Sequence, residues 1–313
     1  LAAEGFNQSA SGSVTDSAGN KSSTTYSGVD IDLTAPQLAL ATRLPAANVN
    51  GWNNTPVTVT YTGTDVLSGI DTVLSDFGAD IFVNEETGAI ASAVIIDDAG
   101  NTTTVSVPDI RIDLTNPIIT VASITASTGT GPDNRSWWNT PVTVRYTVSD
   151  TWSGVDFAVG GFEDDVLPNE GENMDTRGDV TDNAGNHSQV TTTGINIDLT
   201  DPITAITVGM PRVFDPVETF VTSATLFTLA AIDTLSGVTK TEYRIDGGAF
   251  TPYAAFSLST TEGDRTIGFK STDYAANEET ERTVKVIVDN TAPATVLSVD
   301  VTDSTGLVLI PES

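Results

Sequence analysis

The stretch DNAGNHSQVTTTGINIDLTDP, residues 182–202, occurs four times in this chain with the same internal spacing. The other copies are DSAGNKSSTTYSGVDIDLTAP at 16–36, DDAGNTTTVSVPDIRIDLTNP at 97–117 and DYAANEETERTVKVIVDNTAP at 273–293. The prolines that close successive copies are 81, 85 and 91 residues apart. Because a phrase that returns at a nearly fixed period marks a repeat architecture, the chain is predicted to consist of tandem modules.

The repeat divides the chain into three whole modules and two partial ones. The whole modules are predicted at 36–116, 117–201 and 202–292. Residues 1–35 match only the C-terminal half of a module, and residues 293–313 are predicted to start a further one. The chain is therefore interpreted as a window on a longer array. In the alternative interpretation, half-modules of neighbouring subunits complete each other by strand donation.

Apolar and polar residues alternate inside the modules. VTVRYTVSD at 142–150, VTVTYTGTD at 57–65 and TLFTLAAID at 225–233 all keep apolar side chains on one face. A period of two indicates a strand with one buried face, and no stretch has a convincing helical period. The D-x-A-G-N phrase suits a short hairpin turn, because Asp caps the turn and Gly accepts a positive φ. Each whole module is thus predicted to be a seven-stranded antiparallel sandwich with Greek-key connections.

The composition is that of a folded, acidic protein. Among 313 residues, 42 are acidic and 13 basic, for a net charge of −29, while 39% are hydrophobic. Such a charge repels nucleic acid and anionic lipid headgroups and favours cations. No apolar run is long enough to cross a membrane, and the N-terminal stretch lacks the features of a signal peptide. Nucleic-acid partners and membrane insertion of this region are therefore excluded by prediction.

The absence of Cys excludes disulfides and thiolate chemistry, and one His leaves no pair for a zinc site. Carboxylates are plentiful, but they recur with the repeat, whereas an active site is normally built once. The sequence therefore predicts that the protein is not an enzyme.

Several phrases resemble a known family. GWNNTPVTVTYTGTDVLSGID at 51–71, WWNTPVTVRYTVSDTWSGVD at 137–156, the D-x-A-G-N turns and the I-D-L-T-x-P linkers resemble the bacterial extracellular Ig-like repeat superfamily. The last full module, with ATLFTLAAIDTLSGVTKTEYRIDGGAFTPY and IGFKSTDYAANEE, is similar to the Ig-like repeats of leptospiral outer-surface proteins. Ala276 stands where the turn pattern has Gly, which predicts an altered turn there.

The resemblance implies an all-β fold of tandem Ig-like antiparallel β-sandwich modules in an extended array. It also implies a location outside or on the surface of a prokaryotic cell. It does not imply an activity, because such modules serve as spacers, adhesive domains and enzyme accessories alike.

Three aspartate positions recur in each module. One ends a strand before a Ser-Gly turn, one opens the D-x-A-G-N turn and one lies in the linker. In an Ig-type sandwich the two turns lie at the end where the chain enters from the previous module. The predicted sets are Asp32 with Asp65 and Asp97, Asp113 with Asp150 and Asp182, and Asp198 with Asp233 and Asp273.

Each set is a candidate Ca²⁺ site, because a hard divalent cation with oxygen ligands relieves the repulsion between clustered carboxylates. Ca²⁺ takes 6 to 8 oxygen atoms, so backbone carbonyls, waters or Asp98, Asn116 and Asp201 are expected to complete the shell. In the alternative interpretation each aspartate only caps its own turn.

Several further residues are candidates for binding or modification, and each also has a purely structural interpretation. Trp52, Trp137, Trp138 and Trp152 either stack on sugars or cover the ends of modules. The sequons at Asn7, Asn20, Asn53, Asn101, Asn134 and Asn186 are glycosylation sites or turn residues. Lys–Asn cross-links are restricted to Lys240, Lys270 and Lys285 in the last full module. The acidic run 163–165 is interpreted as a solvated loop, and His187 as an exposed strand residue.

The predicted function is a non-catalytic structural array, namely a cell-surface stalk, surface-layer or filament component stiffened by Ca²⁺. Its partners are neighbouring modules or copies of itself in a filament or lattice. The alternative is an adhesin or a carbohydrate-binding accessory region of a larger secreted protein, with a host or glycan ligand.

Overall fold

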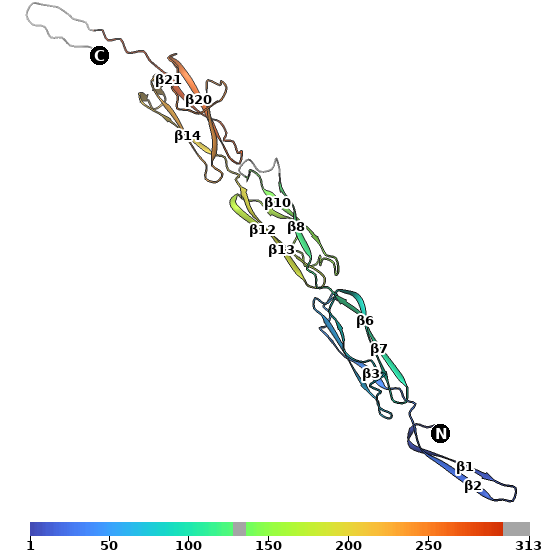
Figure 1. The fold of residues 1–313 in the computed structure, drawn as a ribbon. Helices are drawn as coiled ribbons and strands as arrows, with labels where there is room; N and C mark the ends of the chain where they lie inside the picture. Colours follow the sequence, from blue (N-terminus) through green and yellow to red (C-terminus); the bar gives the residue numbers. More distant parts are fainter. Residues whose placement is uncertain (128–135, 297–313) are drawn as a thin grey trace, which may run out of the picture. The chain divides into compact units, whose positions relative to one another are not determined.

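The computed structural model describes residues 1–127 and 136–296. Within these ranges every regular element is a β-strand, which confirms the predicted all-β class (Figure 1). The sequon at Asn134 and most of the predicted module start at 293–313 lie outside the described residues. No helix in the described ranges is long and apolar enough to cross a membrane.

Residues 1–35 form one antiparallel hairpin of β1 (Gly5–Thr15) and β2 (Lys21–Ile31). Its turn is capped by Asp16, whose Oδ1 accepts the backbone N–H of Asn20 at 2.9 Å. Gly19 in this turn has a φ of 92°, in the left-handed region that glycine adopts without strain. Val14 and Tyr26 are 68% and 73% exposed. The hairpin therefore has the turn and linker of a module but buries no core.

The stretch 36–116 folds into two facing antiparallel sheets. One contains β3 (Gln37–Leu44), β4 (Val57–Thr64) and β5 (Asp80–Phe82), in that order, and the other pairs β6 (Glu86–Ile96) with β7 (Thr102–Ile112). The alternation read from the sequence places one face of each strand inward. The resulting core contains Val57, Val59, Tyr61, Ala91, Ala93, Ile110 and Ile112.

This module has five strands where seven were predicted. The stretch 65–79 forms no strand, and its only ladder contacts in the described structure are single bridges at Ile70 and Asp76. Asp65 and Asp71 cap successive turns with their carboxylates. Val66 and Val73 are 92% and 87% exposed. Closely spaced turn residues thus break the alternation that a strand needs.

The stretch 117–201 repeats this arrangement. One sheet has the order β11 (Asp165–Leu167), β10 (Val142–Ser149), β8 (Ile118–Ala126). The other has β12 (Gly171–Thr181), β13 (His187–Ile197) and the short β9 (Trp137–Trp138), which runs parallel to β13. Val142, Val144, Val180 and Ile197 are fully buried between the sheets.

The stretch 202–292 has a larger second sheet. β14 (Ile203–Val208) pairs with β17 (Phe227–Ile232). The facing sheet has the order β15 (Arg212–Phe214), β16 (Thr219–Val221), β21 (Arg282–Val288), β20 (Gly263–Asp273), β18 (Val238–Ile245), β19 (Thr251–Pro252). Phe227 and Phe269 fill the core, and the ring of Phe227 stacks on that of Phe256 at 5.4 Å.

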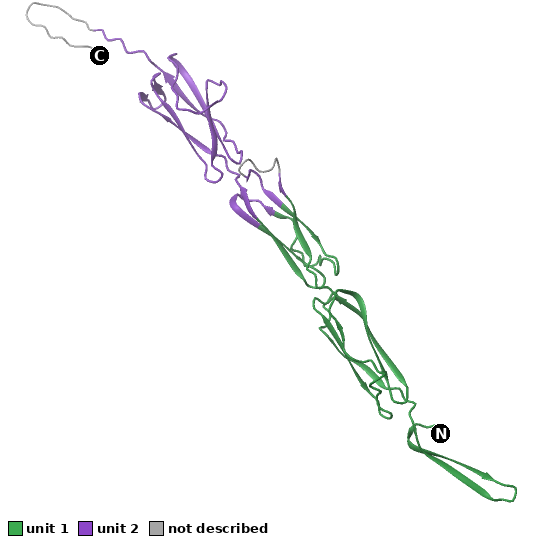
Figure 2. Ribbon diagram, in the orientation of Figure 1, with its two compact units in different colours: residues 1–123, 144–165, 176–192 green, residues 124–143, 166–175, 193–313 purple. Residues whose placement is uncertain are grey.

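The chain divides into two compact units (Figure 2). The first comprises residues 1–123, 144–165 and 176–192, and the second comprises 124–143, 166–175 and 193–313. Each of the three predicted aspartate sets lies wholly within one unit: the first two sets in the first unit and the third in the second.

Candidate metal centre

One aspartate of each set directly follows the last strand of a module. Asp32 follows β2, Asp113 follows β7 and Asp198 follows β13. The backbone N–H groups of Asp113 and Asp198 extend the sheet by donating to the carbonyls of Asn53 at 2.9 Å and Trp138 at 2.8 Å. The Oδ1 atoms of the same two residues then accept the N–H two residues later, at 3.0 and 3.1 Å. This Asx turn bends the linker away from the strand.

The second aspartate of each set opens the Ser-Gly turn. Asp65, Asp150 and Asp233 come directly after β4, β10 and β17. The Oδ1 atom of each accepts the N–H of the glycine four residues later, at 2.8, 2.6 and 2.7 Å. These glycines have φ values of 85°, 78° and 80°, which a residue with a β-carbon adopts only with strain.

The third aspartate closes the long strand before the D-x-A-G-N turn. Asp97 and Asp182 follow β6 and β12, and Asp273 ends β20. The Oδ1 atom of each accepts the N–H of the asparagine four residues later, at 2.8, 2.9 and 2.8 Å. The Oδ2 atom accepts the side-chain Nδ2 of the same asparagine, at 2.8, 2.8 and 2.7 Å.

The turn with Ala276 keeps this shape, so the altered turn predicted from the missing glycine is wrong. Ala276 has a φ of 71°, close to the 91° and 97° of Gly100 and Gly185 at the same position. The hydrogen bonds between Asp273 and Asn277 hold alanine in a left-handed conformation that normally costs about 1 kcal/mol or more.

The structure brings together the three aspartates of each set. Within a set, one carboxylate oxygen from each residue lies within 4.8 Å of the others. The linker carboxylate also bonds directly to the next module, because its Oδ2 accepts the N–H of the serine in the Ser-Gly turn. That distance is 2.9 Å in all three sets. A role for these aspartates in binding metal stays a prediction.

The second and third sets are more enclosed than the first. The linker aspartates Asp113 and Asp198 are 0% exposed, whereas the D-x-A-G-N aspartates Asp97, Asp182 and Asp273 are equally buried at 1%. Asp32, the linker member of the first set, is only half-buried. Burying a negative charge without a positive partner costs free energy. A bound cation would therefore stabilise the second and third sets more than the first.

Burial raises the pKa of Asp182, opposed by hydrogen bonds from Asn186, and the charge of Asp113 raises this pKa further. The pKa of Asp273 is raised in the same way, first by burial and then by the charges of Asp198 and Asp233. The hydrogen bonds from Ser68 instead lower the pKa of Asp32. Both raised values indicate carboxylates whose ionised form is not fully stabilised by the protein alone.

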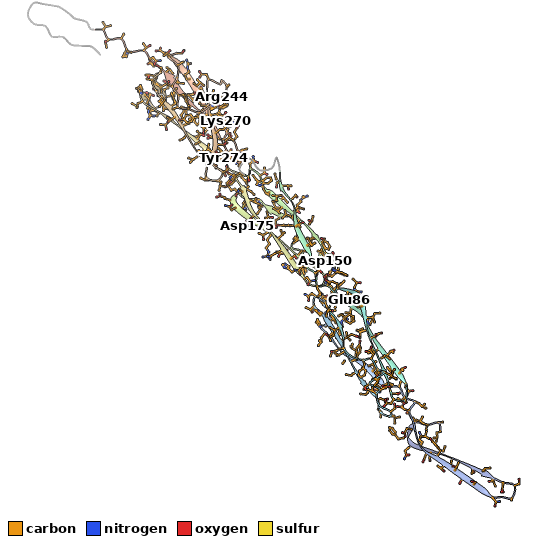
Figure 3. The ribbon with its side chains drawn as sticks, in the orientation of Figure 1. Glu86, Asp150, Asp175, Arg244, Lys270 and Tyr274 are labelled. Atoms are coloured by element: carbon orange, nitrogen blue, oxygen red, sulfur yellow. The ribbon has the colours of Figure 1, made fainter. Side chains whose placement is uncertain are left out.

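One carboxylate oxygen in the second set has no partner. Oδ2 of Asp150 is buried and accepts no hydrogen bond from any described residue, although its Oδ1 caps the Ser-Gly turn. The side chain of Asp150 is labelled in Figure 3. A buried oxygen that is free to bind, next to two further carboxylates, suits a hard cation such as Ca²⁺.

Of the three further cation ligands predicted from the sequence, the structure places Asp98 close to one of the aspartate sets. Asp98 lines a cleft of about 310 Å³ together with Asp32 and Asp30. In the described part of the chain, Asn116 and Asp201 make no hydrogen bond or ion pair. In each set the three aspartates therefore provide ligands that fit a cation, and Asp98 lies next to the first set.

Sequence reasoning missed the recurring asparagine of the D-x-A-G-N turn as a linker contact. Nδ2 of Asn186 donates to the backbone carbonyls of Asp113 at 2.9 Å and Thr115 at 3.2 Å, besides its bond to Asp182. Asn101 and Asn277 make the same contacts. The asparagine recurs at the same place in every turn, and this recurrence is the sequence signal that could have identified the contact. Because the side-chain amide of Asn186 donates to these three acceptors, the structure favours a turn residue over a glycosylation site at this sequon.

The tryptophans do not form a common exposed surface. Trp137 and Trp138 are 8% exposed, and both lie in β9 against β13. Trp52 is half-buried, and Trp152 is 40% exposed. The arrangement favours covering of the module ends over stacking on a sugar.

The acidic run 163–165 is not a convergent site. Glu163 accepts the N–H of Gly161 at 2.8 Å, whereas Asp164 forms an ion pair with Arg145 at 3.0 Å. Asp165 accepts the hydroxyl of Tyr146 at 2.7 Å.

The single histidine and two of the lysines have surface partners. The exposed side chain of His187, at the start of β13, contacts Asp179 at 3.1 Å. Lys240 and Lys270 pair with Glu242 at 2.9 Å and Glu278 at 2.7 Å. These glutamate pairs give no support for a Lys–Asn cross-link.

Residues 160–199 match the bacterial Ig-like domain family. No curated protein matches the chain. Among solved structures, a Ca²⁺-stabilised adhesin that helps an Antarctic bacterium bind ice is 16% identical. The similarity covers 91% of this chain and 82% of that one, with a TM-score of 0.31.

A tetra-tandem repeat from the extending region of a large adhesion protein is 15% identical, over 90% of this chain and 81% of that one, with a TM-score of 0.30. Cadherin domains 3–6 of protocadherin gamma B2 are 12% identical, over 91% and 84%, with a TM-score of 0.31. At these values neither a ligand nor an activity is transferred to this chain. The similarity of the last full module to leptospiral repeats stays a prediction.

Proposed function

We propose that this chain is a non-catalytic structural array of Ig-like modules on the outside of a prokaryotic cell, with Ca²⁺ bound where one module joins the next. A stalk, a surface layer or a filament is the setting that uses such an array. The observation that carries the proposal is the threefold recurrence of one carboxylate set, with its oxygens within 4.8 Å.

The origin of the ligands supports a mechanical role. In each set one carboxylate comes from the linker that leaves a module, and two come from turns of the module that follows. A cation bound by all three ties the linker to the next module. In a tandem array each module contacts mainly its neighbours, so the junctions determine stiffness.

The chemistry of the set supports Ca²⁺. The three aspartates of each set supply carboxylate ligands, which suit hard cations. Ca²⁺ accepts irregular coordination, whereas Mg²⁺ demands a nearly ideal octahedron. When bound, the ion supplies positive charge that stabilises three ionised aspartates in a buried place. The unpartnered Oδ2 of Asp150 is the atom that gains most from it.

Repetition also supports a role without catalysis. The described carboxylate sets repeat at the module period instead of converging once in a cleft. Each member also caps a turn of the fold. These aspartates are thus explained by architecture and cation binding.

A binding role is the second candidate, and one feature favours it. The hairpin β15–β16 has no counterpart in the described parts of the two preceding modules. It exposes Val213, Phe214 and Val217 at 67%, 76% and 89%. Exposed apolar side chains on a hairpin that the described parts of the other modules lack are a feature that a binding surface can use.

Thermal unfolding of the chelator-treated chain, with Ca²⁺ titrated in and Mg²⁺ as control, tests the proposal. A saturable rise of the midpoint with Ca²⁺ and a smaller one with Mg²⁺ is expected. At a Ca²⁺ concentration 100 times its Kd, one site adds about 2.7 kcal/mol to the free energy of unfolding. An unchanged midpoint contradicts Ca²⁺ binding and returns the aspartates to turn capping alone.

A further inference from the structure

A glutamate at the start of each long hairpin binds the linker that leaves the same module. Glu85 directly precedes β6. Its Oε2 accepts the backbone N–H of Leu114 at 2.7 Å, and its Oε1 accepts the hydroxyl of Thr115 at 2.6 Å. We call this pair of bonds the linker clamp.

The linker clamp occurs four times within residues 1–127 and 136–296. Glu170 accepts the N–H of Leu199 at 3.2 Å and the hydroxyl of Thr200 at 2.8 Å. The other two clamps join Glu4 to Leu33 and Thr34, and Glu262 to Asn290 and Thr291. The recurring Thr of the I-D-L-T-x-P phrase is thus explained by its hydroxyl, which donates to this glutamate.

The clamped residues stand next to the linker aspartate. Leu114 and Thr115 directly follow Asp113, whose carboxylate accepts the N–H of Ser153 in the next module. On that side Asn186 also donates to the carbonyl of Thr115 at 3.2 Å. The same three-residue segment is therefore held by its own module through a glutamate and by the next module through the aspartate set.

We propose that Glu85 and Glu170 are positioning residues of the junction sites and hold Asp113 and Asp198 in place before a cation arrives. This inference rests on the proposed function. Fixing the linker beforehand removes part of the ordering cost that binding otherwise meets, which strengthens binding without a new contact to the ion. At Glu85 each of the two carboxylate oxygens accepts one bond, whereas at Glu170 Oε2 accepts both. In both clamps the ionised carboxylate is a stronger acceptor than the single amide oxygen of glutamine.

The chain contains a matched control in Glu86. It adjoins Glu85 and is likewise half-buried, and its side chain is labelled in Figure 3. In the described structure its carboxylate makes no hydrogen bond or ion pair. Glu86→Gln therefore removes the same charge at nearly the same place without opening the clamp.

The experiment uses the full chain with Asp65→Asn and Asp233→Asn, so that only the Asp113 set remains intact. Isothermal titration with Ca²⁺ then measures one site. Glu85→Gln is expected to weaken binding about tenfold, as the loss of one hydrogen bond to a charged group implies. Thr115→Val, which removes the other half of the same clamp, is expected to act similarly, and Glu86→Gln is expected to leave the Kd unchanged.

A second readout needs no ion. In chelator, hydrogen exchange of the peptide containing Leu114 is expected to be faster in Glu85→Gln than in Glu86→Gln, because the neutral amide of Gln is a weaker acceptor for the Leu114 N–H than the carboxylate of Glu85. Equal Ca²⁺ affinity in the two variants overturns the positioning role. If the parent chain binds no Ca²⁺, the proposed function fails instead. Equal hydrogen exchange at Leu114 in Glu85→Gln and Glu86→Gln overturns the linker clamp itself.

Discussion

The carboxylate of Asp113 accepts a hydrogen bond from the backbone N–H of Ser153 at 2.9 Å, across 40 residues of sequence. Asp113 lies near the end of one repeat, and Ser153 lies in the Ser-Gly turn of the next. The corresponding bond has the same length in the other two sets. The linker is therefore tied to the following module by a contact that needs no ion, and a cation adds charge compensation to it.

Asp150→Asn is expected to have opposite effects with and without Ca²⁺. In chelator the variant should be more stable by about 1 kcal/mol, because an unpartnered buried oxygen loses its charge while Oδ1 still caps the turn. At saturating Ca²⁺ it should be less stable than the parent chain. Urea unfolding in both conditions measures the two differences.

Asp71→Asn is the control for that comparison. Asp71 caps a turn through the N–H groups of Val73 and Leu74, at 2.9 and 3.0 Å, and belongs to no set. Its substitution should change stability by the same small amount in chelator and in Ca²⁺. If Asp150→Asn also has equal effects in the two conditions, Asp150 is a turn cap only.

Asn186→Ala is expected to lower the free energy of unfolding by about 1–3 kcal/mol, because it leaves buried acceptors on Asp182 and Asp113 without a donor. Asn20→Ala is the matched change in an exposed copy of the turn, where the amide bonds only to Asp16. It should cost less than the substitution of Asn186. Similar losses in thermal unfolding for both variants would contradict a role of Asn186 in holding the linker.

Stability without Ca²⁺ should depend on pH through Asp182. Its pKa is raised above 3.8 by burial, so the folded state binds a proton more tightly than the unfolded state. Its contribution is therefore fully present below pH 3.8 and is lost as the pH rises through the folded pKa. The stability of the parent chain relative to Asp182→Asn should fall across that window in chelator.

Asp179→Asn gives the opposite sign. The pKa of Asp179 is lowered, first by its hydrogen bond with Arg177. Its contribution is present above pH 3.8 and is lost as the pH falls through the folded pKa. Denaturant titrations from pH 3 to 7 compare the two variants with the parent chain. If the stability difference between the parent chain and each variant changed with pH in the same direction, the raised pKa of Asp182 would be contradicted.

Trp138→Ala is expected to destabilise the chain by about 3–5 kcal/mol, because the side chain is 8% exposed and its strand pairs with β13. Trp152→Ala, at a position that is 40% exposed, should cost much less. Thermal unfolding compares the two. A Trp138→Ala chain that keeps its stability and loses binding on a glycan array would instead support the carbohydrate-binding alternative.

The repeated phrase was sufficient to predict the grouping of the aspartates, because strand ends and turns recur at fixed places in a sandwich. It was not sufficient to predict the stretch 65–79, where turn capping by Asp65 and Asp71 replaces a strand. The roles of Asn186 and Glu85 were also missed. Both depend on contacts with a linker distant in sequence, and a period alone does not identify the partner of a side chain.

Each repeat has two carboxylates at its entrance and one at its exit, so neither end is a complete site. Any in-frame duplication of one repeat in the gene therefore creates a full site at the new boundary, and any deletion of a whole repeat joins two matching halves. Unequal recombination could change the length of such a protein freely while every boundary keeps the same chemistry.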